Sequence, residues 1–332
     1  MNVRQYVAKR THLDLGKGKE KMHFASNKRW LLAAMATLAL ALPILAGRWI
    51  NLAPLPNALA NMNVNSINGL LYVTGGQESS GSRVSSLYSY NPTSNSWSTL
   101  ASLPAALDQA ESGVINGQLY YAGGWDSSLP TSGLYIYDPP SNTWTTGPGL
   151  SHLSGGGIGG EINVKLYVTT PDNGYNGYTN YLDMYDPSAG AWTSLPDSID
   201  AHSSGAGGVI NNKLYVSSGV GDSYGWTSVT EVYDPVANTW TNLAPIPMPV
   251  VNPGSAVSCG RLFVIGGAFS NGTVSNLVQV YDPLNNNWAS QVQRTTRQAF
   301  GASVIDHYIL AVGGVNSASQ FLTTNQATQS CH

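Results

Sequence analysis

Ionisable side chains that could do acid–base chemistry are few and widely spaced in this sequence. His152 and His202 could each carry a proton or bind a metal, and Asp200 lies two residues before the second histidine. Glu111 adds another carboxylate, and Arg297 could stabilise a developing negative charge. Nothing in their spacing makes them a catalytic set. We therefore expect no catalytic residues, no metal centre and no cofactor, and we treat His152, Asp200, His202 and Arg297 as candidate binding residues.

Two glycine-rich segments match active-site signatures in their residue types but not in the structural context that these signatures require. Residues 155–160 fit G-x-G-x-x-G, and residues 221–225 fit G-x-S-x-G. The first signature needs a following helix to hold a pyrophosphate, and the second needs a strand that runs directly into a helix. The flanking residues predict an inner strand for the first segment and a loop between strands for the second. Neither motif therefore supports a nucleotide site or a nucleophile.

Aromatic residues gather in three polar segments, where they could contact a ligand. The candidates are Trp125 with its neighbour Asp126, then Tyr175, Tyr178 and Tyr181, and finally Tyr224 and Trp226. Flat aromatic faces beside Asp, Asn and Ser suit stacking on a sugar ring with hydrogen bonds to its hydroxyls, and they also suit a protein interface. The alternative is that these side chains pack their own loops.

The elements that position these residues follow from a repeat. Six tryptophans recur every 47 or 48 residues, at positions 49, 97, 144, 192, 240 and 288. Each repeat has a run of small residues, then a strand-like apolar run anchored by a residue such as Leu119, then a second run ending in a tyrosine such as Tyr137. The tyrosine precedes the tryptophan by seven residues. A period of this length predicts a repeat architecture.

Glycine pairs and Asp-Pro or Asn-Pro turns mark the corners of the repeat. Four of the apolar runs end in a glycine pair, as at Gly123 and Gly124, where positive φ or close backbone approach is expected. Repeats three and four differ, with residues 169–171 and 217–219 in that place. Asp138 and its counterparts precede a proline, so we expect them to cap turns rather than to catalyse.

This pattern resembles the kelch-repeat β-propeller family, and specifically an exported bacterial kelch protein. The resemblance covers roughly residues 49–320 and implies an all-β, six-bladed propeller with four strands in each blade. Residues near Trp49 supply only an outer strand and residues from Arg297 onward supply inner strands. We therefore expect the N- and C-terminal strands to close the last blade together.

The resemblance implies that the variable loops and the inter-blade connections share one face, around the channel mouth. We expect binding there, by a recognition module for a glycan or protein ligand. One alternative is a sugar-processing enzyme of the mutarotase or epimerase type, like bacterial kelch proteins that act on sialic acid, with Glu111, Asp200, His202 and Arg297 as its acid–base candidates. Another is a structural surface scaffold. Copper oxidases of the galactose oxidase kind need a tyrosine crosslinked to a cysteine, and neither cysteine here is placed for it.

Charge and hydropathy separate a leader from the repeats. Residues 1–46 hold eight Lys or Arg against two Asp or Glu, whereas residues 47–332 hold seven against sixteen. The acidic repeats exclude nucleic acid as a partner because that requires a basic face. We expect a basic region over 1–29, an apolar leader helix over 30–46 that is either a signal peptide or a transmembrane anchor, and a monomeric propeller over 47–332 outside the cytoplasm.

The two cysteines, Cys259 and Cys331, could form a disulfide or remain as free thiols. An oxidising compartment would permit a disulfide that ties the C-terminal tail to blade five. Two free thiols fit the sequence equally well.

Overall fold

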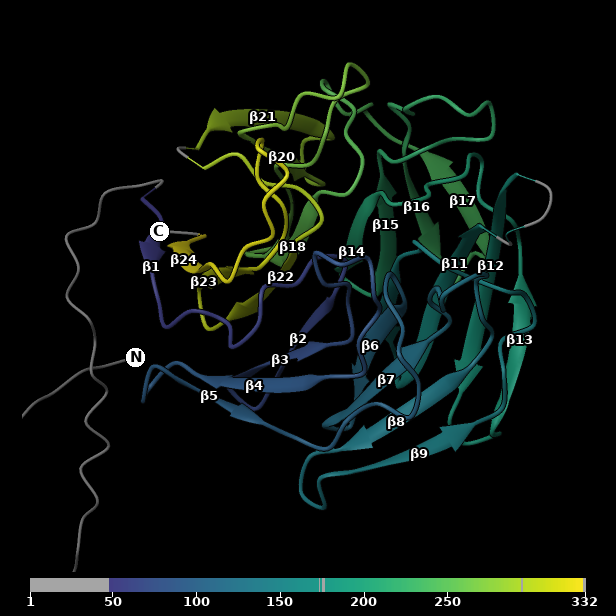
Figure 1. Cartoon of the computed structure of the whole chain (residues 1–332). Helices are drawn as coiled ribbons and strands as arrows, with labels where there is room; N and C mark the ends of the chain where they lie inside the picture. The colour runs from purple at the N-terminus through teal and green to yellow at the C-terminus, as the bar shows by residue number, and fades with distance from the viewer. Residues whose placement is uncertain (1–47, 173, 175–176, 294, 331–332) are drawn as a thin grey trace, which may run out of the picture. The chain divides into compact units, whose positions relative to one another are not determined.

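The computed structural model describes residues 48–330 apart from 173, 175–176 and 294, and no helix occurs in that part of the chain. Six antiparallel four-stranded sheets form a closed ring, shown in Figure 1. The predicted six-bladed β-propeller is therefore confirmed. The leader helix expected over 30–46 lies outside the described residues.

The strands follow chain order from the inside of each blade to the outside, except in the last blade. Blade one contains β2 (Asn63–Ile67), β3 (Leu70–Thr74), β4 (Leu87–Asn91) and β5 (Ser96–Thr99); blade two contains β6 (Glu111–Ile115), β7 (Gln118–Ala122), β8 (Leu134–Asp138) and β9 (Thr143–Gly147); blade three contains β10 (Gly159–Ile162), β11 (Lys165–Asp172), β12 (Tyr178–Asp186) and β13 (Ala191–Leu195). Blade four contains β14 (Ala206–Ile210), β15 (Lys213–Ser217), β16 (Thr230–Asp234) and β17 (Thr239–Asn242); blade five contains β18 (Gly254–Ser258), β19 (Arg261–Ile265), β20 (Leu277–Asp282) and β21 (Asn287–Val292). Blade six contains β22 (Gly301–Ile305), β23 (Tyr308–Val312), β24 (Asn325–Gln329) and, from the other end of the chain, β1 (Ile50–Asn51).

The core lies between neighbouring blades, where the repeated apolar residues meet. Leu119 pairs with Tyr137, which pairs in turn with Trp144 on the outer strand. Leu119 and Tyr137 are fully buried and pack with Tyr72 and Leu87 of blade one. Each sheet therefore buries one face against the preceding blade, which explains why all the blades need the same apolar pattern.

The tryptophans and tyrosines also tie neighbouring blades through hydrogen bonds. The indole Nε1 of Trp97 donates to the carbonyl oxygen of Ala53 at 2.9 Å, and four other outer-strand tryptophans bond the preceding linker in the same way. The Tyr90 hydroxyl donates to Oδ1 of Asn95 at 2.7 Å in the outer turn. This turn carries the predicted cap, because Oδ1 of Asn91 accepts from the backbone N–H of Thr93.

The glycine pairs leave room for the next linker. Gly75 has φ +63°, and a Cβ there would collide with the carbonyl oxygen of Leu107, to which the N–H of Gly76 donates at 2.9 Å. Blade three lacks this bond, because Pro171 has no N–H. Blade four keeps this bond, because the N–H of Gly219 donates to the carbonyl oxygen of Val250 at 2.9 Å, and the Ser218 hydroxyl donates to the same oxygen at 2.7 Å. The predicted difference in shape is therefore confirmed for blade three, whereas it was wrong for blade four, where Ser218 at φ +64° and Gly219 at φ +90° keep the backbone geometry of a glycine pair.

A ring of backbone hydrogen bonds encircles the channel just before the inner strands. Each member donates its N–H to the carbonyl oxygen of its counterpart in the preceding blade, at 2.7 to 2.9 Å, and each has positive φ. The members are Asn61, Gln109, Gly156, Ser204, Asn252 and Ala299. Gly155 and Gly157 belong to this linker and not to the inner strand, which begins at Gly159, so their strand assignment from sequence was wrong.

The ring closes as predicted, because β1 pairs with β24 in the register Ile50 to Ala327. Cys259, in the inner turn of blade five, forms a disulfide. The chain's other cysteine is Cys331, which lies outside the described residues.

Candidate functional site

The inter-blade linkers and the loops between second and third strands share one face of the propeller, as predicted. Trp125, directly after a glycine pair, forms a bridge with Asp108 of the linker that enters its own blade. Val220 forms the equivalent bridge with Ser203. All the candidate binding residues within the described chain belong to these two kinds of segment, or to the strands next to them.

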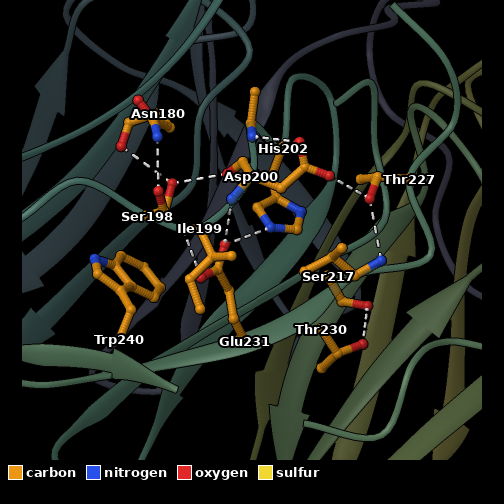
Figure 2. Close-up of polar contacts among 12 residues, drawn as sticks. Asn180, Ser198, Ile199, Asp200, His202, Ser217, Thr227, Thr230, Glu231 and Trp240 are labelled. Atoms are coloured by element: carbon orange, nitrogen blue, oxygen red, sulfur yellow. Dashed lines mark hydrogen bonds and ion pairs between the residues drawn. The ribbon is translucent and has the colours of Figure 1, made fainter. Parts of the chain in front are cut away.

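His202 is buried in an ion pair that fixes the linker into blade four (Figure 2). Its Nε2 lies 2.9 Å from Oε1 of Glu231, and its Nδ1 lies 2.8 Å from the carbonyl oxygen of Ser218. Both groups accept hydrogen bonds, so both ring nitrogens are occupied in one structural contact. The residue is only 2% exposed, which leaves it no surface for a ligand.

Asp200 has a similar structural role in the same linker. Its Oδ1 accepts from the backbone N–H of Asp222 at 2.9 Å, and its Oδ2 accepts from the Thr227 hydroxyl. The carboxylate therefore holds the blade-four loop against the linker, as Figure 2 shows for the Thr227 contact. Its oxygens are occupied by donors of the chain itself.

The same strand position clamps the linker in three consecutive blades. This position lies two residues before the repeated tyrosine, and it carries Asp183, Glu231 and Gln279. Gln279 accepts from the N–H of Met248 and donates to its carbonyl oxygen, whereas Asp183 bonds His152. A repeated contact of this kind is evidence of structural work. The sequence analysis did not consider Asp183 and Glu231, and the signal that could have found them is their shared place two residues before the repeated tyrosine.

Glu111 and Arg297 are also buried, at opposite sides of the ring. Oε1 of Glu111 accepts from the Ser154 hydroxyl and the N–H of Gly157, each at 2.8 Å, and burial raises the pKa of the carboxyl to about 8. The Arg297 guanidinium lies 4.6 Å from the centre of the Phe300 ring and donates to the carbonyl oxygen of Ala311. Burial lowers the pKa of Arg297 to about 10. Both residues are 1% exposed, so neither can meet a ligand.

His152 differs from His202, because only one of its nitrogens is used. Nδ1 lies 3.1 Å from Oδ2 of Asp183, whose Oδ1 accepts from the Ser194 hydroxyl at 2.8 Å. The imidazole stacks on Tyr181 with a centroid distance of 4.2 Å, and its side chain is 32% exposed. No partner of its Nε2 occurs among the described residues. His152 is therefore the one candidate histidine that can meet a ligand.

The loop aromatics separate into three places rather than one patch. Trp125 is half-buried over Gly155, where a Cβ would collide with the indole. Trp226 donates from Nε1 to the carbonyl oxygen of Ala268 in blade five at 3.1 Å. Asp126 caps its own turn by accepting from the N–H groups of Ser128 and Leu129, which lowers its pKa. These three residues hold loops in place, whereas Tyr175 lies outside the described residues.

Tyr178, which is half-buried, and Tyr224, which is exposed, form an aromatic pair. Their ring centroids lie 5.5 Å apart, and Tyr224 is 67% exposed. Tyr224 has φ +61°, and its N–H donates to the carbonyl oxygen of Gly221 in a tight turn. Its hydroxyl lies over the backbone of Gly177, where a Cβ would collide with it. A tyrosine held at positive φ on the surface is strained, and such strain often accompanies binding sites.

The channel itself offers little space on this face. The cavity inside the backbone ring has a volume of about 130 Å³ and is lined by all six ring residues. The Nε2 of Gln109 lies 3.3 Å from Oδ1 of Asn252 across it. Pockets for small organic ligands usually measure about 300 Å³ or more. A ligand of this size does not fit in this cavity, so the loops around it are the better candidate for a binding surface.

Within 48–330, apart from the gaps, no group of three or more metal-binding side chains comes together. The same residues contain no helix that is long and apolar enough to span a bilayer.

The sheets, their order and the closure define the molecule as a six-bladed β-propeller. The Kelch motif model matches residues 58–104, 108–151, 202–247 and 249–291, more than half of the chain, so the protein belongs to the kelch-repeat family. Blade three is not among the matched segments, in agreement with its altered corner at Pro171.

Comparison with solved structures shows the same fold, with 742 matching chains. One is the structure titled "Structure of YjhT", which has a TM-score of 0.71 and 20% sequence identity and aligns over 82% of this chain and 95% of that one. No curated protein matches the sequence significantly. A likeness at this identity establishes the fold alone, so function must be argued from the site.

Proposed function

We propose that this propeller binds a carbohydrate on the loops of blades three and four, with Tyr178 and Tyr224 as the stacking surface. The observation that carries the proposal is this aromatic pair, in which the rings lie 5.5 Å apart and Tyr224 is 67% exposed although its backbone has positive φ. Sugar rings present apolar C–H faces that pack on aromatic rings, while the hydroxyls of the ligand need polar partners. Asp222 and Ser223 of the same turn supply such partners.

A protein ligand fits the surface less well. A standard protein interface buries about 800 Å² on each partner around a central apolar cluster. Other exposed large hydrophobic residues do not form one continuous apolar centre: Val236 and Leu284 lie in outer turns of different blades, and the Trp226 indole next to Tyr224 is bonded to Ala268. Two tyrosines at one loop contact suit a small ring-shaped ligand better than a protein surface.

Binding is also favoured over catalysis. The acid–base residues that an enzyme of this fold would need here, Glu111, Asp200, His202 and Arg297, are occupied in contacts between blades and linkers. Three of them are almost completely buried. A scaffold without any small ligand is the remaining alternative, and the binding experiment below distinguishes it.

We further propose that the propeller works outside the cytoplasm, with residues 1–29 as a basic region, 30–46 as a signal peptide or membrane anchor and 47–332 as the propeller. The disulfide at Cys259 supports this, since disulfides persist in oxidising compartments. N-terminal sequencing of the protein from cells would show whether cleavage occurs near Ala46. A propeller recovered only in the cytoplasm with reduced cysteines would contradict the proposal.

The direct test of binding is a glycan array probed with the purified whole chain and with a Tyr178→Ala variant. We expect saturable binding to a family of related saccharides, and its loss in Tyr178→Ala with the melting temperature preserved. A blank array for the wild-type protein would favour a scaffold. Equal binding by the variant would place the site elsewhere.

A further inference from the structure

A buried carboxylate fixes the orientation of His152 and leaves one of its nitrogens unused. Asp183 is fully buried and has two partners, the Nδ1 of His152 at 3.1 Å and the Ser194 hydroxyl at 2.8 Å. A carboxylate only accepts hydrogen bonds, so Nδ1 must carry the proton in this contact. In the neutral imidazole, this leaves a bare lone pair on Nε2.

The surroundings of His152 hold this lone pair in place. The ring stacks on Tyr181 at 4.2 Å with an interplanar angle of 24°, which restricts rotation about the side chain. The side chain is 32% exposed, and no donor among the described residues bonds Nε2. His202, which has the same kind of carboxylate partner, has no free nitrogen, because Ser218 occupies its Nδ1. The Nε2 of His152 is therefore an available acceptor in the linker into blade three, whereas His202 offers none in the linker into blade four.

His152 lies close along the same blade to the proposed stacking surface. Tyr181 and Tyr178 are three residues apart on β12, a Cα separation of roughly 10 Å along a strand. The pairing of β12 with β11 shifts register between these two tyrosines, so the contact of His152 with Tyr181 and the contact of Tyr178 with Tyr224 lie on either side of a β-bulge. A ligand that contacts both groups has to span this separation, so it needs more than one sugar ring.

We propose that His152 is a specificity-determining residue of the carbohydrate site, whose Nε2 accepts a hydrogen bond from a hydroxyl of an oligosaccharide lying across blade three, with Asp183 as its positioning residue. This inference rests on the proposed function, because it names the polar contact of the same ligand. It predicts that a ligand derivative lacking this hydroxyl binds more weakly.

Asn and Gln variants of His152 separate recognition from structure. In His152→Asn, the side-chain amide can stand where Nδ1 stood and keep the bond to Asp183, but the acceptor at the Nε2 position is lost. In His152→Gln, the longer amide can reach the Nε2 position. We expect His152→Asn to weaken binding by roughly three- to tenfold with an unchanged melting temperature, as for one lost hydrogen bond, and His152→Gln to recover part of it.

The experiment titrates the whole chain with maltotetraose, cellotetraose and mannotetraose, and it records the histidine tautomers by ¹⁵N NMR without ligand. The signals of the His152 ring are assigned as those missing from the spectrum of His152→Asn. The proposal expects these signals to show the Nδ1–H tautomer in the wild type and a change of tautomer in Asp183→Asn. Wild-type binding that His152→Asn leaves unaltered, or an Nε2–H tautomer, would overturn this inference while the proposed function stands. Absence of wild-type binding to all three probes would overturn both.

Discussion

At the scale of single residues, burial decides what each ionisable group can do. Glu111 has one carboxyl oxygen in two hydrogen bonds, whereas the other has no partner among the described residues. A carboxylate in that position would leave a buried charge uncompensated, so burial raises its pKa from 4.5 to about 8. The folded protein therefore keeps a proton that the unfolded chain loses.

This proton makes stability depend on pH. The unfolded state binds fewer protons than the folded state between about pH 4.5 and 8, so the contribution of Glu111 is complete below that range and is lost as pH rises through it. We expect the unfolding free energy of the wild type to fall by up to about 1.4 kcal/mol per pH unit relative to Glu111→Gln, and the difference to level off above pH 8. Urea unfolding at pH 5 to 9 measures this.

A matched control is Glu78→Gln, which makes the same substitution in a loop of blade one. A change in pH dependence that both variants share is a general effect of replacing Glu by Gln and is subtracted from the Glu111→Gln result. If the unfolding free energy of Glu111→Gln then ran parallel to that of the wild type, Glu111 would not be protonated in the folded state.

The repeated tyrosines provide a second test at this scale. The Tyr233 hydroxyl bonds Oδ1 of Asn238, but blade three has Gly190 where the asparagine would be, so the Tyr185 hydroxyl lacks that bond. We expect Tyr233→Phe to cost about 1 kcal/mol of unfolding free energy and Tyr185→Phe to cost almost nothing. Denaturant unfolding of both variants decides this, and equal losses would refute the role of the asparagine.

Residue roles were harder to predict from the sequence than residue positions. The turn-capping role expected for Asp138 and its counterparts is supported by the structure, because capping depends only on local spacing. The partners of His152 and His202 lie about 30 residues away, on the third strand of the next blade. The residues next to each histidine in the linker do not predict these contacts. The two histidines were therefore equivalent in the sequence, although only His152 has a ring nitrogen without a partner among the described residues.

At the scale of elements, the strands were predictable and the loops were not. Leu119, Tyr137 and Trp144 fix three strands of a blade through burial, and this demand recurs in every repeat. Loop aromatics have no such constraint. The Trp125 indole packs over Gly155, and the Trp226 indole donates a hydrogen bond to the carbonyl oxygen of Ala268 in the next blade. Sequence spacing does not predict either contact.

Trp226 therefore has a structural role between two loops. Its indole bonds blade five at Ala268 while the ring remains 36% exposed. We expect Trp226→Ala to lower the unfolding free energy by about 1 to 2 kcal/mol through the lost hydrogen bond and packing, without changing carbohydrate affinity. Thermal unfolding and titration of the same sample test both parts, and a stable variant with lost binding would assign Trp226 to the site instead.

At the scale of the whole molecule, the contact between blades five and six leaves space open. A groove of about 440 Å³ opens there, lined by Trp49, Phe263 and Ile309 among others. Three residues after the tryptophan, most blades place a leucine such as Leu243, whereas blade five has Gln291. The sequence shows this substitution, but only the structure shows the groove that results.

Filling this groove should stabilise the ring. We expect Gln291→Leu to raise the unfolding free energy by about 1 kcal/mol through added apolar burial, and Leu243→Gln in blade four to lower it by a similar amount. Hydrogen exchange should locate both effects at the respective blade contacts. A destabilised Gln291→Leu would mean that the groove needs its polar lining.

The six-bladed ring and its closure could be predicted from sequence periodicity, because every blade buries the same set of apolar residues against its neighbour. The proposed ligand site could not, since its tyrosines Tyr178 and Tyr224 lie in segments of blades three and four that the repeat pattern does not specify. Residues that differ from the repeat pattern indicate where a repeat protein is specialised, but tertiary contacts determine the positions of those residues. The proposed site therefore rests on the structure.

The most direct test is calorimetric titration of an oligosaccharide from the array into the wild type, Tyr224→Phe and Tyr224→Ala. We expect Tyr224→Phe to bind nearly as the wild type does, because the ring face is kept, and Tyr224→Ala to lose at least tenfold in affinity with an unchanged melting temperature, about 1.4 kcal/mol of stacking. Undiminished binding by Tyr224→Ala would contradict a carbohydrate site on the blade-three and blade-four loops.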